Sequence, residues 1–112
     1  MANTFKVSTK SSVGVGSSSA STIYTAPSST TTVVLALLLA NKHSSAVSAT
    51  VILSSDTGSN ADVHIIKDIS ISTQCSLEIM AGQKYVLETT DAIKVYADNA
   101  NLDVTLSYME IT

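Results

Sequence analysis

The side chains that could support catalysis or bind a metal are few and scattered along the chain. Two histidines, His43 and His64, and one cysteine, Cys75, occur without a second His or Cys at the spacing of a zinc site. A serine nucleophile needs a histidine and an acid that converge on it, and the many serines include no Gly-x-Ser-x-Gly motif. The sequence therefore predicts no catalytic residue, no metal site and no cofactor, and it indicates a protein that is not an enzyme.

The segment 56–62 carries oxygen ligands at alternate positions, as a calcium site does. Its residue order does not fit the EF-hand loop, so the favoured interpretation is a plain hairpin loop. Gly14 and Gly16 lack the third glycine and the lysine of a phosphate-binding loop. A carbohydrate- or calcium-binding adhesion module remains an alternative function, and the 56–62 loop is its only support.

The composition predicts one small β-rich domain. The chain has 112 residues, only 13% of them charged, and Ser and Thr make up almost a third of it. β-branched residues suit a pleated, half-buried surface. The chain has no Arg and its net charge is −3, so a direct nucleic-acid partner is not expected.

Neither a membrane nor a disulfide is expected to be involved. The longest apolar run, 33–40, is far shorter than a membrane helix, and the N-terminal residues do not form a signal peptide. We therefore expect a protein that is made in a cytoplasm and is not exported by that route. Cys75 has no partner for an intrachain disulfide and lies in an apolar alternating stretch, which predicts a small buried side chain.

Alternation with a period of two residues runs through most of the chain after residue 22. It is clearest in 46–55, 63–72 and 102–108, and turn-forming clusters separate the alternating segments every eight to twelve residues. This pattern predicts an all-β fold, a single antiparallel β-sandwich of about eight strands that resembles a jelly roll.

The most apolar segment, 33–42, is predicted to be a strand that is buried on both faces, and its second face needs a cover from the other sheet or from another subunit. We expect this segment to form a hairpin with 46–55. After Tyr108 the apolar positions shift to Met109 and Ile111 on either side of Glu110, which predicts a bulge or a strand end that packs on something new.

The first 22 residues are poor in apolar side chains. Residues 10–22 are mostly Ser and Gly, and they bury too little apolar surface to offset the entropy of ordering. Residues 3–9 fit a short strand or an extended arm. The predicted organisation is an extended N-terminal arm over 1–22 and a β-sandwich domain over 23–112.

Several segments resemble small virion structural proteins of tailed bacteriophages, especially marine and cyanobacterial phages. The similar segments are 1–7, the Ile-Tyr-Thr-Ala-Pro of 23–27 with the Ser/Thr run after it, Leu-Ala-Asn at 39–41, 91–97 and the final 108–112. The likeness covers 1–7 and about 22–112, but not the Ser/Gly-rich 11–21. Related proteins serve as capsid decoration, collar or neck, and fibre subunits, so the resemblance implies a structural protein of the virion.

The expected function is that of a capsid decoration, or cement, subunit that docks on the particle through its N-terminal arm and its oligomer interface. The expected partners are further copies of the chain, as a homotrimer, and the major capsid protein. A tail, neck or fibre module is the alternative. The expected interface residues are Phe5, Lys6, Val7, Tyr24, Met109 and Ile111.

The charges divide unevenly along the chain. Residues 1–55 carry three lysines and no acid, and residues 56–112 carry all nine acids. Two interpretations fit this asymmetry. Strands from the two halves can interleave within one molecule, or the basic N-terminal segment can dock on an acidic surface of a neighbouring copy.

Overall fold

The computed structural model describes residues 2–55, 57–80 and 82–112, and the regular structure in this part of the chain is almost entirely β-strand. The strands are β1 (Asn3–Lys10), β2 (Gly14–Val15), β3 (Ser21–Thr25), β4 (Thr31–Asn41), β5 (Val47–Ser54), β6 (Val63–Ile71), β7 (Ser76–Glu78), β8 (Tyr85–Leu87), β9 (Ala92–Ala97) and β10 (Leu102–Ile111). Two short 3-10 helices, η1 (Ser17–Ser19) and η2 (Thr57–Ser59), lie in loops. No helical segment among the described residues has the length and apolar character needed to span a membrane.

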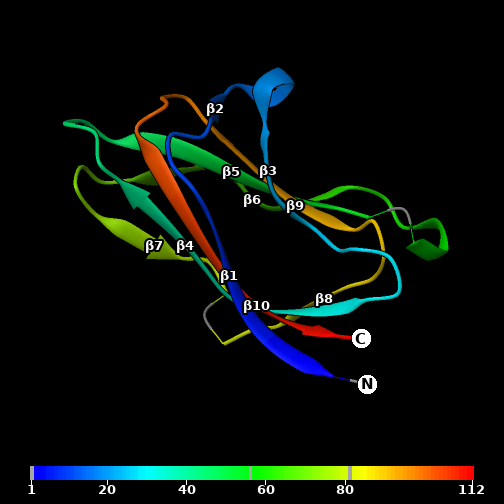
Figure 1. Cartoon of the computed structure of the whole chain (residues 1–112). Helices are drawn as coiled ribbons and strands as arrows, with labels where there is room; N and C mark the ends of the chain where they lie inside the picture. The colour runs from blue at the N-terminus through cyan, green and yellow to red at the C-terminus, as the bar shows by residue number, and fades with distance from the viewer. Residues whose placement is uncertain (1, 56, 81) are drawn as a thin grey trace.

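The strands form two sheets that face each other (Figure 1). Sheet A has the order β1-β10-β4-β7, and β8 pairs with the same strand β4; sheet B has the order β2-β9-β5-β6, and β3 pairs with the same strand β9. Most connections carry the chain from one sheet to the other. The β5–β6 connection is an exception, because both strands are neighbours in sheet B. Because β7 and β8 share one position beside β4, and β2 and β3 share one beside β9, this is the eight-position arrangement of a jelly roll. The predicted all-β sandwich is confirmed.

The core lies between the sheets and follows the alternation of the sequence. The inward side chains of β10 and β4 are at most 7% exposed, and they include Leu102, Val104, Leu106, Tyr108, Val34, Leu37 and Leu39. Inward side chains of β5 and β9, such as Val51 and Val95, meet them from sheet B. Burial of these branched side chains is the main stabilising contribution to the fold.

The N-terminal residues belong to the sandwich, so the prediction of a separate arm over 1–22 is wrong for its described residues 2–22. β1 pairs with β10 along its whole length, from Asn3 opposite Ile111 to Lys10 opposite Val104. Val13 is only 1% exposed and belongs to the core. Backbone hydrogen bonds to a neighbouring strand do not depend on apolar side chains. In β1 these bonds help to offset the entropy of ordering, which the few apolar side chains of this segment cannot offset by themselves.

β4 and β5 do not form the predicted hairpin, because they lie in different sheets. The chain turns the corner at Asn41, which is 3% exposed. Its Nδ2 donates to the carbonyls of Ser45, Ile71 and Ser72 at 2.9 to 3.1 Å, and its Oδ1 accepts from His43 N at 2.8 Å. This buried amide ties the β4–β5 connection to the end of β6 and so directs the chain into the other sheet.

β6 departs from the predicted alternation over 63–72. Val63 and Ile69 are 51% and 40% exposed, and Ile71 is the buried end of the strand. Two register shifts interrupt the pairing with β5, and Asp68 takes a left-handed conformation with φ of 51°. An irregular edge strand turns its side chains out of a strict period of two.

Candidate docking surface

The outer face of sheet A carries a row of apolar side chains that crosses four strands. Phe5 of β1 lies opposite Met109 of β10, Met109 lies opposite Val33 of β4, and Val33 lies opposite Val86 of β8. Directly opposite residues on neighbouring strands point to the same face of a sheet. We call this set the apolar row. Phe5 is 71% and Val86 60% exposed, while Met109 and Val33 are half-buried.

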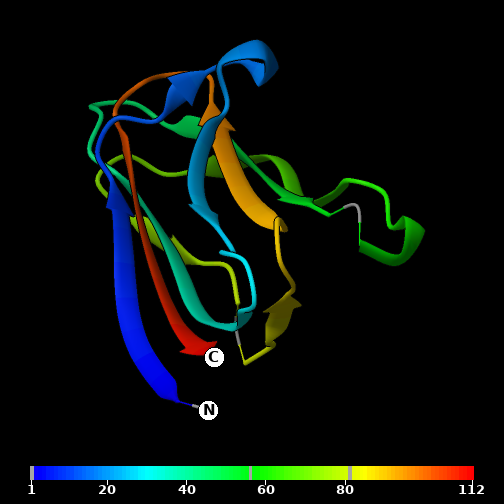
Figure 2. The same ribbon diagram turned by 45° about the vertical axis from the view of Figure 1, so that its right-hand side comes forward.

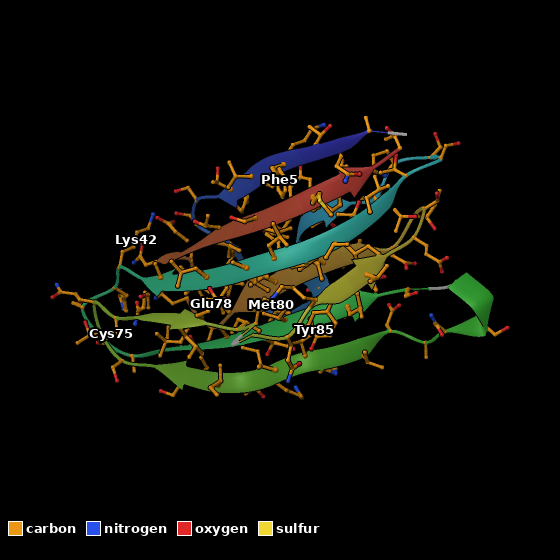
Figure 3. The ribbon with its side chains drawn as sticks, turned by 90° about the horizontal axis from the view of Figure 1, so that it is seen from below. Phe5, Lys42, Cys75, Glu78, Met80 and Tyr85 are labelled. Carbon is orange, nitrogen blue, oxygen red and sulfur yellow. The ribbon has the colours of Figure 1, made fainter. Side chains whose placement is uncertain are left out.

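Further apolar side chains flank the apolar row on the same face. Val7, on the same side of β1 as Phe5, is 60% exposed, and Leu38 of β4 is 37% exposed. Ile111 lies two residues beyond Met109 on β10 and is half-buried. Figure 3 views this side of the molecule, with β1, β10 and β4 side by side and Phe5 over the edge of the sheet.

The sequence of β4 explains why this face is apolar. Inward positions of the strand hold Val34, Leu37 and Leu39, and the residues between them are apolar as well. The register between β4 and β10 shifts by one residue, so that Leu35 is extra in β4. Within the described chain this second face has no cover, and Leu38 on it is exposed. The expected burial of 33–42 on both faces is therefore not reached in a single chain.

Charge is missing from most of this face. The outward side chains of β1 and of the last four outward positions of β10 are uncharged, namely Asn3, Phe5, Val7, Thr9, Thr105, Ser107, Met109 and Ile111. The carboxylate of Asp103 lies at the far end, opposite Ala40, and Glu78 lies opposite Leu38 on the edge strand β7. A face of this kind suits contact with another apolar protein surface and not with a charged ligand.

A polar cluster lies on the inner side of the same strands. Lys6 Nζ is 2.8 Å from Glu110 Oε1, and the Tyr24 hydroxyl donates to Glu110 Oε2 at 2.6 Å. The Tyr24 hydroxyl also lies 2.8 Å from Thr32 Oγ1, and the centroid of the Tyr24 ring is 4.2 Å from the centroid of the Tyr108 ring. We call Lys6, Tyr24 and Glu110 the inner cluster, and it links β1, β3 and β10.

The inner cluster is matched in charge. The Lys6 ammonium, and then the Tyr24 hydroxyl, hold the pKa of Glu110 below its ordinary value. The same carboxylate raises the pKa of Lys6. Burial, and next the hydrogen bond to Glu110, raise the pKa of Tyr24. Because Glu110 is only 7% exposed, the cluster fixes strands to one another and leaves little of its carboxylate open to a ligand.

The structure separates the six predicted interface residues into two groups. Phe5, Val7, Met109 and Ile111 share the outer face, whereas Lys6 and Tyr24 belong to the inner cluster. The apparent shift of the pattern after Tyr108 has a simple cause. The strand keeps its alternation, but its last inward position is Glu110, and its last two outward positions, Met109 and Ile111, are apolar.

Sequence reasoning missed three residues of this face: Val33, Leu38 and Val86. The signal for the first two was present, because 33–40 is apolar at every position and needs a cover on its second face. Val86 had no such signal, since the pairing of the short β8 with β4 depends on the tertiary fold.

The charge asymmetry of the sequence is resolved within one molecule. Lys6 pairs with Glu110, and Lys42 Nζ lies 2.9 Å from Asp103 Oδ1. Both ion pairs join a lysine of the first half to an acid of the second half, as interleaved strands require. Both are part of the sandwich itself.

The described residues show no assembled catalytic or metal-binding chemistry. They contain no group of three or more His, Cys, Asp or Glu side chains that could hold a metal ion. Within the 56–62 loop, Asp62 Oδ1 accepts from Ser54 Oγ and Ser55 N, and Asp56 lies outside the described residues. A hollow of about 290 Å³ beside this loop is lined by apolar residues of β5, β6 and β8 and by mostly polar residues of the adjoining loops.

Cys75 is exposed, which corrects the expectation of a buried side chain. It follows a turn in which Cys75 N donates to Ser72 O and Gln74 takes a φ of 56°. The turn places it before β7, so it does not take an inward position of that strand.

A comparison of the fold identifies one solved structure with the same architecture. It belongs to Bacillus endospore appendages, described as a novel family of disulfide-linked pili, with a TM-score of 0.53 and 13% sequence identity over 99% of this chain and 87% of that chain. The two share a fold. At this identity the likeness concerns architecture alone. No protein-family model and no curated protein matches the chain.

Proposed function

We propose that this chain is a non-enzymatic structural subunit that docks on a larger protein assembly through the outer face of sheet A. The observation that carries the proposal is the apolar row on a face that is almost free of charge. Contiguous apolar patches above roughly 300–600 Å² are uncommon on monomeric proteins and mark interaction sites. The partner is an apolar, uncharged protein surface, since water exclusion is the interaction that such a face provides.

Within this role we favour a phage virion, with capsid decoration on the major capsid protein as the first position. The support is the resemblance of 1–7 and about 22–112 to small virion proteins, together with the apolar row on the outer face of sheet A. A tail, neck or fibre position is the alternative. The homotrimer expected from the sequence stays a prediction.

A pilus or appendage subunit is the second candidate, favoured by the fold shared with the Bacillus endospore appendages. The disulfide linkage of those pili cannot hold a polymer of this chain together in the same way. A disulfide-linked polymer needs at least two cysteines in each subunit, and the 112 residues contain one, Cys75. A single thiol can link only two copies, so a filament of this chain would be held by non-covalent contacts.

The proposal is tested by locating and counting the chain in purified particles of a phage that encodes it. Electron cryo-microscopy with quantitative mass spectrometry distinguishes the positions: hundreds of copies per particle indicate decoration, and a small multiple of three, five or six indicates a tail or collar. Absence from purified particles would contradict the virion proposal, and helical filaments of the pure protein would favour the pilus candidate.

A pair of matched variants tests the docking face itself. Leu38→Lys places a charge on the outer face of sheet A, and Ile69→Lys places one on β6 of sheet B at a similar exposure, 37% against 40%. Added to particles that lack the chain, the Leu38→Lys protein should lose most of its occupancy, while Ile69→Lys should bind as the wild type does. Equal occupancy of the two variants would show that another face makes the contact.

A further inference from the structure

The four sheet edges of the sandwich differ in how well they are protected against pairing with another strand. An edge strand exposes backbone N–H and C=O groups, and natural proteins block such edges with short strands, bulges or charges. β7 and β8, at one edge of sheet A, have three residues each. In sheet B, β3 and β6 carry register shifts, and β6 adds Lys67 and the left-handed Asp68.

β1 is neither short nor bulged, and its charges are those of Lys6, which pairs with Glu110, and of Lys10 at its end. It has eight residues, it pairs with β10 without a register shift, and no residue described in it has a positive φ. Figure 2 shows β1 as the outermost strand beside β10, with its other side open. A long, regular and exposed edge is a ready template for an added strand.

The pairing pattern indicates which backbone groups of β1 face the open side. Ala2 and Thr112 exchange both of their backbone hydrogen bonds at 3.0 Å. In an antiparallel ladder such pairs recur at every second residue, so the even-numbered residues of β1 bond to β10. The N–H and C=O groups of Asn3, Phe5, Val7 and Thr9 therefore point to the open side.

We propose that two copies of this chain pair antiparallel through their β1 edges, so that sheet A continues across a two-fold axis into the second copy. An antiparallel pair of identical strands is self-complementary and closes as a dimer. Several registers allow the open-side N–H and C=O groups of the two β1 strands to bond to each other. In each of them, odd-numbered residues of one copy lie opposite odd-numbered residues of the other. A register centred on Lys6 would place two ammonium groups directly opposite each other, which is unfavourable.

The register centred on Phe5 avoids that repulsion. It pairs residues 2–8 of the two copies, places Lys6 opposite Thr4, and leaves Lys10 beyond the paired stretch. Lys6 is already neutralised by Glu110 at 2.8 Å. In this register the two Phe5 side chains lie opposite each other, so the apolar row of one copy runs without interruption into that of the other.

The choice of a second copy as the occupant follows from this continuity. The apolar row runs from Val86 through Val33 and Met109 to Phe5, where it ends at the β1 edge. Only an added strand with an aromatic or aliphatic side chain opposite Phe5 extends it. A second β1 provides that side chain by symmetry. The pairing does not depend on the proposed docking function, although it would double the apolar face that a particle meets.

The experiment measures association of the full chain by sedimentation equilibrium. An interface formed by one pair of edge strands buries less surface than a standard protein–protein interface. We therefore expect a reversible dimer with a dissociation constant on the order of micromolar to sub-millimolar. Val7→Pro removes one open-side N–H and spares the bonds to β10, and it should abolish the dimer. Val7→Thr keeps that N–H and should dimerise as the wild type does.

Disulfide formation tests the register even if Val7→Pro does not fold. In a Cys75→Ser background, Phe5→Cys should cross-link rapidly, because paired Cα atoms at a hydrogen-bonded position lie about 5.5 Å apart, within the range of a disulfide. Val7→Cys should not, because the two substituted residues would be offset by four residues along the strands and so roughly 14 Å apart. A protein that is monomeric at about 500 µM, that forms only a closed trimer, or that cross-links equally at both positions would overturn the proposal.

Discussion

The sharpest stability prediction concerns Asn41, whose side chain joins the β4–β5 connection to the end of β6. Asn41→Ala removes two N–H donors, which are shared among three carbonyls, and one accepted bond, and the bond to Ile71 O is buried. Each lost hydrogen bond costs about 0.5–1.5 kcal/mol, and a carbonyl that is left buried without a partner costs about 1–3 kcal/mol. Solvent can replace the more exposed partners, so we expect a loss of about 2–4 kcal/mol.

The assay is urea unfolding at neutral pH, with the midpoint converted to free energy through an unchanged slope. At roughly 4 °C per kcal/mol for a domain of this size, the melting temperature should fall by about 8–16 °C. Asn101→Ala is the control, because Asn101 is exposed and its side chain makes one contact, to His43 Nδ1. It should change the stability by less than about 0.5 kcal/mol.

A second substitution separates lost donors from lost packing. Asn41→Asp keeps the shape and the acceptor for His43 N, but a carboxylate cannot donate to the three carbonyls. It should destabilise at least as much as Asn41→Ala at pH 7, and it should recover part of the loss at acidic pH, where the protonated carboxyl can donate. If both variants unfold within about 0.5 kcal/mol of the wild type, the idea that this amide holds the corner is wrong.

Two further predictions address the inner cluster and the core. Because the folded state lowers the pKa of Glu110, the contribution of its ion pair to stability is present above the unfolded pKa of about 4.3 and is lost as the pH falls through the lower folded value. Glu110→Gln should therefore be less stable than the wild type at pH 7 and should show a smaller further loss between pH 5 and pH 2, and equal acid slopes would contradict this. Leu37→Ala should cost about 2–5 kcal/mol and Leu38→Ala less than about 1 kcal/mol, because these adjacent side chains are 0% and 37% exposed; similar urea midpoints would disprove the assigned faces.

The features of the fold that were predictable from sequence are those that depend on neighbours along the chain. Alternation over 102–108 predicts both the last strand and its inward side, and Leu102, Val104 and Leu106 are buried accordingly. The apolar outward positions of 33–42 likewise indicate a face that one chain cannot cover.

The sequence by itself thus determined the all-β class and the inward positions of the central strands, because side-chain direction in a strand is set by a local period of two. The tertiary structure alone decided which strands became neighbours: β1 joined β10, β4 and β5 separated into two sheets at Asn41, and Val86 completed the apolar row. Backbone N–H and C=O groups are nearly identical in every residue, so the pairing that satisfies them leaves little trace in the sequence. It depends on contacts between distant residues, such as Lys6 with Glu110, which form only once the chain has folded.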